Sequence, residues 1–223
     1  MTQESKSKPV VSVSVLHMGW WRHEIALQMI ALSHDPRYDL RIEAPSASPI
    51  ASNRCEIALR ARNVLDAAWI LMVDSDCRMG GNPLDMIEKD LDIVAWPALC
   101  YKPNRLVDAR DPFVWNMTPH DEYGNIFNDM DLDRPVERGG IGAHMMLIAR
   151  RVLEHPDMRA PFQDEFDVDG VRIGGEDIRF CFRARKAGFK VWAILSEPAG
   201  HVKEVDMMVP RRVIDDAKRH DTD

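Results

Sequence analysis

The stretch "WILMVDSD", residues 69–76, combines the pattern of a buried strand with two carboxylates. Its apolar run is typical of a strand that lies inside a sheet. Because side chains two residues apart in extended backbone point the same way, Asp74 and Asp76 face one side. Carboxylate oxygens are the ligands that Mg²⁺ and Mn²⁺ prefer. The stretch therefore predicts a cation site completed by water and substrate phosphate; the alternative is that both acids only cap the next turn.

Strands and helices alternate on the amino-terminal side of this stretch. The predicted elements are a strand at 10–16, a helix at 20–32, a strand at 39–43 and a helix that begins at 52–56. Asn53 is the predicted N-cap of the last helix, with Glu56 reaching back from three residues on. Such alternation is typical of a mostly parallel sheet with helices on its faces. Ligands bind beyond the carboxyl ends of such strands, where Asp74 and Asp76 lie.

The carboxyl-terminal half continues the alternation around one long irregular region. The predicted elements are helices at 85–90, 150–154, 174–187 and 210–219 and strands at 92–98, 144–149 and 190–195. Region 103–138 is too long for a simple connector, so we expect a functional loop or a hairpin over the site. The expected organisation is a flexible tail at 1–8, one α/β domain at 9–205 and a polar helix or tail at 206–223.

The overall composition excludes several classes of protein. A formal net charge of -7 argues against binding nucleic acid through bulk charge. The four cysteines lack C-x-x-C spacing, which predicts neither a disulfide framework nor a zinc site. No apolar run approaches the length that spans a membrane. These features favour a protein of the reducing cytoplasm.

Three further groups of residues are candidates for chemistry. Glu176 and Asp177 follow two glycines at a predicted helix start, where acids serve as a general base or as caps. His201 follows a strand and a glycine, where an imidazole serves as a metal ligand or as a structural side chain. Arg54 and Arg62 lie on the helix before the aspartate pair and suit phosphate recognition, although surface arginines are usually just solvated.

Four ordered segments carry a resemblance to a known family. They are ALRARNVLDAAWILMVDSD at 58–76, ERGGIGAHMMLIARRVLE at 137–154, GGEDIRFCFRARKAGFKVW at 174–192 and GHV at 200–202. With them the chain resembles the GT-A class of nucleotide-sugar glycosyltransferases, and most of all the family 2-type enzymes and their small bacteriophage relatives. The resemblance implies an α/β fold of the GT-A type: a single Rossmann-like, mostly parallel mixed sheet flanked by helices.

The resemblance also implies a cofactor, Mn²⁺ or Mg²⁺, and a donor, a UDP- or GDP-sugar. Asp177 would take the proton of the acceptor hydroxyl, so that transfer inverts the anomeric centre, and Glu176 would orient the acceptor or the donor sugar. The implied metal ligands are Asp76, His201 and Asp74, which alternatively contacts the ribose. The implied donor contacts are Arg62, Arg54, Asp74 and the loop residues Gly140, Ile141 and Gly142.

Two segments depart from the family pattern. The segment 17–21, HMGWW, stands where many members carry a Pro-Thr or Pro-Tyr nucleotide loop, and the segment 43–45, EAP, replaces a pair of acids. Base recognition is therefore not implied, and Trp20 and Trp21 suit stacking on a base or sugar, packing in the core or the start of the helix. The acceptor is equally open: a modified DNA base, a glycan, a lipid-linked sugar, a protein or a small molecule, in the host cytoplasm if a phage encodes the enzyme.

Two other functions fit parts of the sequence. Haloacid dehalogenase-type phosphatases also use an apolar strand ending in D-x-D, with the first acid, here Asp74, as the nucleophile. Arg78 stands where those enzymes usually carry Thr or Val, and the motif lies in the middle of the chain. The second alternative is a GT-A-like module that binds nucleotide sugars without turnover. The D-x-D pair, the E-D pair and His201 are all present, which favours an enzyme, and none of these patterns implies an oligomeric state.

Overall fold

The computed structural model describes residues 7–17, 19–46, 49–102, 113–128 and 131–202. Its helices are α1 (His23–Ser33), α2 (Ile50–Asn63), α4 (Arg150–Glu154), α5 (Glu176–Lys186) and the 3-10 helices η1 (Pro83–Lys89) and η2 (Pro156–Met158). The strands of the main sheet are β1 (Val10–Leu16), β2 (Asp39–Glu43), β3 (Trp69–Asp74), β5 (Ile93–Ala95), β9 (Val136–Glu137), β11 (Met145–Ala149) and β14 (Val191–Ala193). Shorter strands pair as β4 (Cys77–Arg78) with β15 (Gly200–His201), β6 (Leu99–Tyr101) with β7 (Phe113–Trp115), β8 (Met117–Thr118) with β10 (Gly140–Ile141), and β12 (Glu165–Phe166) with β13 (Arg172–Gly174).

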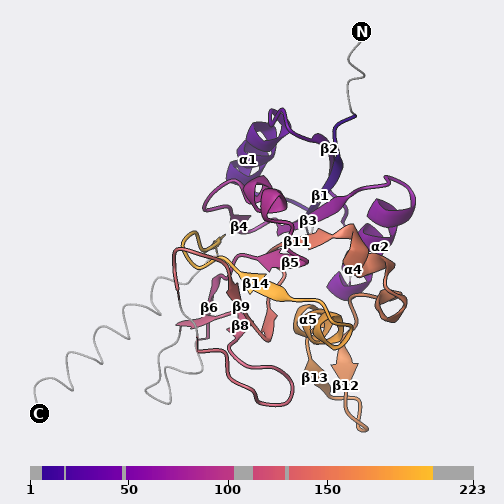
Figure 1. Cartoon of the computed structure of the whole chain (residues 1–223), viewed down its shortest axis with the longest axis vertical. Helices are drawn as coiled ribbons and strands as arrows, with labels where there is room; N and C mark the ends of the chain where they lie inside the picture. Colours follow the sequence, from indigo (N-terminus) through magenta and orange to yellow (C-terminus); the bar gives the residue numbers. More distant parts are fainter. Residues whose placement is uncertain (1–6, 18, 47–48, 103–112, 129–130, 203–223) are drawn as a thin grey trace, which may run out of the picture.

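A mixed seven-stranded sheet forms the centre of the fold (Figure 1). The strand order is β2-β1-β3-β11-β5-β14-β9. Strands β2, β1, β3, β5 and β14 share one direction, whereas β11 and β9 run the opposite way. Helix α1 lies on one side of the sheet and α2, α4 and α5 lie on the other. The predicted α/β class, with a mixed sheet flanked by helices, is confirmed.

The antiparallel strand β11 shapes the sheet at the end of β3. Met145 pairs with Val73 and Ala149 pairs with Trp69, so β11 begins where β3 ends. The segment before β11 therefore reaches the carboxyl end of β3, where the Asp74 amide donates a hydrogen bond of 2.8 Å to a backbone carbonyl of that segment. Strand direction alone thus brings a second stretch of chain to the predicted cation site.

Two predicted helix starts are wrong in detail. Helix α2 begins at Ile50, and its N-cap is Pro49 in extended backbone, so Asn53 is buried inside the helix and does not cap it. The short helix predicted at 85–90 is a 3-10 helix that starts at Pro83. Proline accounts for both differences, because its fixed φ suits the first residues of a helix and it lacks the amide hydrogen that an interior position needs.

The long region 103–138 is partly regular structure. Its described parts include β7, β8 and β9, which pair with β6, β10 and β14. The helix predicted at 210–219 and most of the tail predicted at 1–8 lie outside the described residues. Within the part of the chain that the structure describes, no helix has the combined length and hydrophobicity that crossing a membrane requires.

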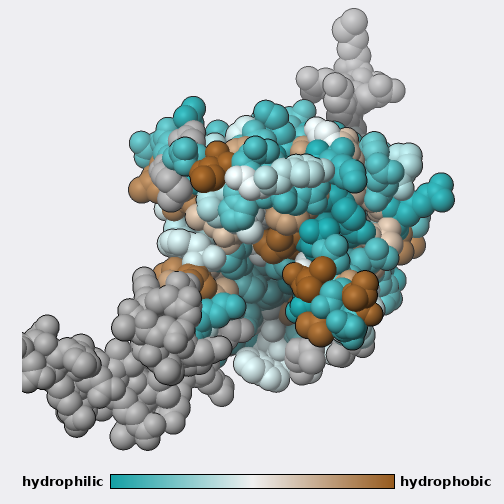
Figure 2. All heavy atoms as spheres, turned by 90° about the horizontal axis from the view of Figure 1, so that it is seen from below, coloured by the Kyte–Doolittle hydropathy of each residue, from teal (hydrophilic) through white to brown (hydrophobic). Residues whose placement is uncertain are grey.

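Aromatic packing anchors α5 to the core. Phe180 is fully buried, and its ring stacks on that of Phe162 with the centroids 4.4 Å apart. The β12–β13 hairpin precedes α5 and stays outside the core, and Figure 2 shows hydrophobic side chains gathered on that part of the surface. Its exposed apolar residues are Phe166, Val168, Val171 and Ile173. The first turn of α5 is therefore held between a packed core and an exposed hairpin.

Leu71→Ala tests how much the buried side chains of β3 contribute to the free energy of unfolding. Leu71 is fully buried between β1 and β11, so its truncation should lower the free energy of unfolding by about 2–5 kcal/mol in urea denaturation. Leu27→Ala is the matched control, because Leu27 is 62% exposed on α1 and the same change there should cost no more than about 0.5 kcal/mol. Equal losses in the two variants would contradict the central place of β3.

Candidate active site

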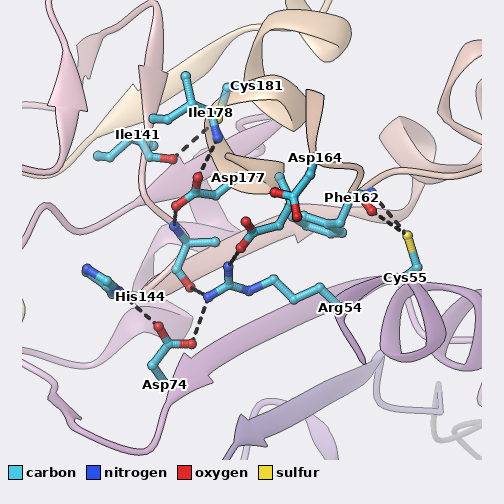
Figure 3. A network of polar contacts seen from close by, with 12 residues as sticks. Arg54, Cys55, Asp74, Ile141, His144, Phe162, Asp164, Asp177, Ile178 and Cys181 are labelled. Atoms are coloured by element: carbon cyan, nitrogen blue, oxygen red, sulfur yellow. Dashed lines mark hydrogen bonds and ion pairs between the residues drawn. The ribbon is translucent and has the colours of Figure 1, made fainter. Parts of the chain in front are cut away.

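A buried guanidinium joins three distant segments of the chain (Figure 3). Arg54 lies on α2, and its side chain is only 3% exposed. Its Nη2 donates hydrogen bonds to Asp74 Oδ1 at 2.8 Å and to the Ala143 carbonyl at 3.3 Å, and its Nη1 pairs with Glu176. The end of β3, the segment before β11 and the first turn of α5 therefore meet at one side chain.

The charges around Arg54 balance one another. Burial acts to lower the pKa of the Arg54 guanidinium, but the Asp74 and Glu176 carboxylates outweigh burial and the net pKa is raised. Arg172 donates to the second oxygen of Glu176 at 2.8 Å. A buried ion pair is tolerated only when its remaining polar atoms are also bonded. Glu176 meets this condition, because two arginines share its carboxylate.

Asp74 is held from two sides. Arg54 binds one carboxylate oxygen, and His144 Nδ1 lies 2.9 Å from the other. This pairing supplies the positive charge that a buried strand end with two acids requires. It also disfavours the phosphatase alternative, since a nucleophilic Asp74 needs a free oxygen aimed at substrate. Arg54 and His144 leave Asp74 with less capacity for a metal ion than the sequence indicated.

Asp177 lies beside this cluster but outside the buried ion pairs. One of its carboxylate oxygens accepts a hydrogen bond of 3.3 Å from the Ala143 amide, and the other accepts one of 2.8 Å from the Ile178 amide. Its side chain is half-buried, whereas that of Glu176 is 5% exposed. Of the two acids in the E-D pair, Asp177 is therefore the more exposed.

Asp76 and His201 are brought together by the pairing of β4 with β15. Cys77 lies opposite His201 in this pair, and the Val202 amide donates to the Asp76 carbonyl at 2.8 Å. Asp76 Oδ2 and His201 Nε2 are 3.6 Å apart. In an octahedral site with bonds of about 2.1 Å, neighbouring ligand atoms are about 3.0 Å apart. The observed separation is wider than this, and joint binding of a Mn²⁺ or Mg²⁺ ion by Asp76 and His201 stays a prediction.

Cys100 and His144 belong to the same neighbourhood, and sequence reasoning missed both. Cys100 Sγ lies 3.8 Å from His144 Nε2 and 3.9 Å from His201 Nδ1. The two histidines lower the pKa of the Cys100 thiol to about 6. Burial acts to lower the pKa of His144, but hydrogen bonds with Asp74 and Cys100 raise it to about 9. In the sequence, Cys100 belongs to no metal-binding or catalytic motif, and His144 is the first residue of a predicted buried strand.

Arg62 lies away from the site. Its Nη1 donates to the Leu153 carbonyl at 2.7 Å, near the end of α4. Helix α4 follows Ala149, which pairs with Trp69 at the amino end of β3. Arg62 is therefore at the opposite end of β3 from Asp74, and its predicted contact with a donor has no support from this geometry.

The glycine loop is packed rather than open. Gly140, Ile141 and Gly142 are all buried. A Cβ on Gly142 would lie 2.1 Å from Asn116 Nδ2, and one on Gly140 would lie 3.2 Å from the Ile178 side chain. These glycines permit close approach of β10 to the neighbouring chain. Contact between this loop and a donor sugar stays a prediction.

Exposed aromatic side chains border the site. Trp20 and Trp21 follow β1 and are 57% and 36% exposed, so the core-packing alternative for them is wrong. A cavity of about 370 Å³ lies beside His201, and its lining includes Arg78 and Trp115. Both places offer aromatic surface for a base or a sugar ring.

Comparison with known proteins shows the fold alone. No family model matches the chain, and no curated protein matches it. A197 from STIV aligns with a TM-score of 0.52 at 18% identity, over 87% of this chain and 86% of that chain. HddC from Yersinia pseudotuberculosis aligns with a TM-score of 0.32 at 12% identity, over 95% of this chain and 78% of that chain, a likeness too slight to support an argument. The chain thus shares its fold with A197.

Arg54→Met tests the buried cluster. The change leaves Asp74 and Glu176 without their shared cation, so the free energy of unfolding in urea should fall by about 3–5 kcal/mol. Arg60→Met, on the same helix, removes a half-exposed arginine that pairs with Glu43, and should cost at most about 1 kcal/mol. The cluster does not hold the fold together if the two variants are equally stable.

The rate at which Cys100 is alkylated should depend on pH in an unusual way. Because only the thiolate reacts, the rate at which iodoacetamide alkylates Cys100 should rise with pH and reach half its maximum near pH 6. The rate is measured by mass spectrometry in the presence of a chelator. His144→Gln should move this midpoint up toward the ordinary thiol value of 9.0, because the imidazolium partner is lost. Cys55, whose pKa is raised by burial, is the internal control and should react only above that value. A midpoint near pH 9 for Cys100 in the unmodified protein would show that the pKa of its thiol is not lowered.

Proposed function

We propose that this protein is a metal-dependent glycosyltransferase of the GT-A type. It would move a sugar from a nucleoside-diphosphate sugar, with UDP or GDP as the nucleotide, to an acceptor hydroxyl. The observation that carries this proposal is the Arg54 cluster, which joins Asp74 of the D-x-D strand to Glu176 of the E-D helix. The motifs behind the family resemblance therefore meet at one end of β3, where open α/β sheets bind ligands.

Asp177 is the general base in this proposal. Glu176 is committed to Arg54 and Arg172, whereas the Asp177 carboxylate is half-buried and accepts hydrogen bonds from two backbone amides. The acceptor O–H gives its proton to Asp177 as its oxygen forms a bond to the anomeric carbon. The bond from that carbon to the diphosphate oxygen breaks on the opposite face, and the nucleoside diphosphate leaves with the electron pair. Displacement in one step inverts the anomeric centre.

The remaining residues bind and orient. A Mn²⁺ or Mg²⁺ ion, held by Asp76 and His201, would supply positive charge to the diphosphate leaving group. Arg54 is too buried to touch a donor and acts as a positioning residue, because it holds Asp74 and Glu176. The exposed ring of Trp20, beyond the carboxyl end of β1, is suited to stack on the nucleotide base.

The test is a screen of nucleotide sugars with Mn²⁺, scored by release of the nucleoside diphosphate and followed by mass spectrometry of candidate acceptors. With an active donor and acceptor, Asp177→Asn should lower the rate of transfer by about 10²–10⁴-fold, since the base is lost. Asp76→Ala should abolish the dependence on Mn²⁺. Asp169→Asn is the matched control, because Asp169 is exposed in the β12–β13 hairpin, and it should retain full activity.

Two outcomes separate this proposal from its alternatives. Transfer that survives both Asp177→Asn and Asp76→Ala would exclude the assigned roles. Nucleotide sugars that bind in calorimetry but are never turned over would instead indicate a binding module.

A further inference from the structure

We propose that Cys100, His144 and His201 form a second metal site, which takes a thiophilic divalent ion such as Zn²⁺. The three residues come from β6, from the segment before β11 and from β15, and each offers one ligand atom. These ligand atoms all lie within 4.8 Å of one another. The site uses a thiol and two imidazoles, the donor set that favours zinc over Mg²⁺ or Mn²⁺. It does not rest on the proposed sugar transfer.

The distances fit tetrahedral coordination. Zinc bonds of about 2.3 Å to sulfur and about 2.0 Å to nitrogen place the two ligand atoms about 3.6 Å apart. Cys100 Sγ lies 3.8 Å from His144 Nε2 and 3.9 Å from His201 Nδ1. Shifts of a few tenths of an ångström would bring Cys100 to these distances, and the two imidazole nitrogens, which lie within 4.8 Å of one another, would close to about 3.3 Å around one ion.

The outer contacts have the form that metal-binding histidines need. A ligating imidazole usually hydrogen-bonds a carboxylate or a carbonyl through its other ring nitrogen. His144 Nδ1 lies 2.9 Å from Asp74 Oδ2, and His201 Nε2 lies 3.6 Å from Asp76 Oδ2. Asp74 is thus placed to orient the His144 ring, and Asp76 lies close enough to reach the His201 ring after a small shift, a role that the sequence pattern did not indicate.

His201 belongs both to this site and to the proposed Mn²⁺ or Mg²⁺ site, the hard-ion site, which it shares with Asp76. Its Nδ1 lies 3.1 Å from the Leu99 carbonyl, and its Nε2 lies 3.6 Å from Asp76 Oδ2. Zinc at Nδ1 requires this nitrogen without a proton, and the neutral ring then carries its hydrogen on Nε2. A neutral imidazole has one lone pair, so zinc beside Cys100 and a hard ion beside Asp76 exclude each other at His201.

Three protein ligands leave a fourth position open. Zinc sites of this kind hold water or a substrate atom there. The cavity of about 370 Å³ lies beside His201, one of the three ligands, and also includes Leu99 and Trp115 in its lining.

The test uses the full chain, stripped of metal by a chelator and without any nucleotide sugar. Titration should give one Zn²⁺ per chain, and Co²⁺ should give a sulfur-to-cobalt charge-transfer band together with the visible bands of tetrahedral cobalt. Cys100→Ser should abolish the charge-transfer band and raise the Kd for zinc by more than about 100-fold, since loss of an outer contact alone costs about 10–100-fold. Cys55→Ser, which changes a thiol bonded to the Phe162 backbone, should leave both measurements unchanged.

A second measurement covers the case in which Cys100→Ser does not fold. In the unmodified protein, one equivalent of Zn²⁺ should protect Cys100 from alkylation, whereas the slow alkylation of Cys55 should have the same rate with and without zinc. The zinc site is overturned if zinc does not bind, if Cys100→Ser keeps the charge-transfer band, or if zinc fails to protect Cys100. Because no sugar donor is present, failure of the proposed transferase activity would leave all of these results unchanged.

Discussion

The arrangement of the site depends on one buried cation, the guanidinium of Arg54. A buried arginine is stable only if carboxylates and carbonyls surround it, and here they come from the end of β3, the segment before β11 and the start of α5. The same contacts fix Asp74 and Glu176, so the stability of the fold and the arrangement of the site rest on a single side chain. Asp177 lies beside this centre, and Asp76 and His201 meet each other where β4 pairs with β15.

Much of the fold could be predicted because its strands have clear patterns. The alternating residues 10–16 and the apolar run before Asp74 are strands at the predicted places. The errors lie at helix ends, where local chemistry decides: Pro49 precedes α2, so Asn53 has no amide to cap. The reversed direction of β11 had no counterpart in any local pattern, since pairing between strands depends on residues far apart in the chain.

The site could be predicted only where its residues form motifs. The D-x-D and E-D pairs are recognisable by spacing, but Cys100 and His144 acquire meaning only when β6 and β11 bring them beside His201. Arg62 is the opposite case: it is predicted to lie in the site, but it lies away from it. Residues two turns apart on one helix can lie near opposite ends of the same strand. Arg54, only two turns away on α2, points into the cluster, whereas Arg62 bonds a carbonyl in α4.

The contact between Arg54 and Glu176 spans 122 residues, which bears on how the chain is made. During synthesis α2 and β3 leave the ribosome long before the first turn of α5. Until α5 arrives, Arg54 lacks one of its two carboxylates, and the core around it cannot close. Folding that needs such distant contacts is slow. We therefore expect the core around Arg54 to close only after α5 has been made, and incomplete chains that end before α5 to be readily degraded by proteases.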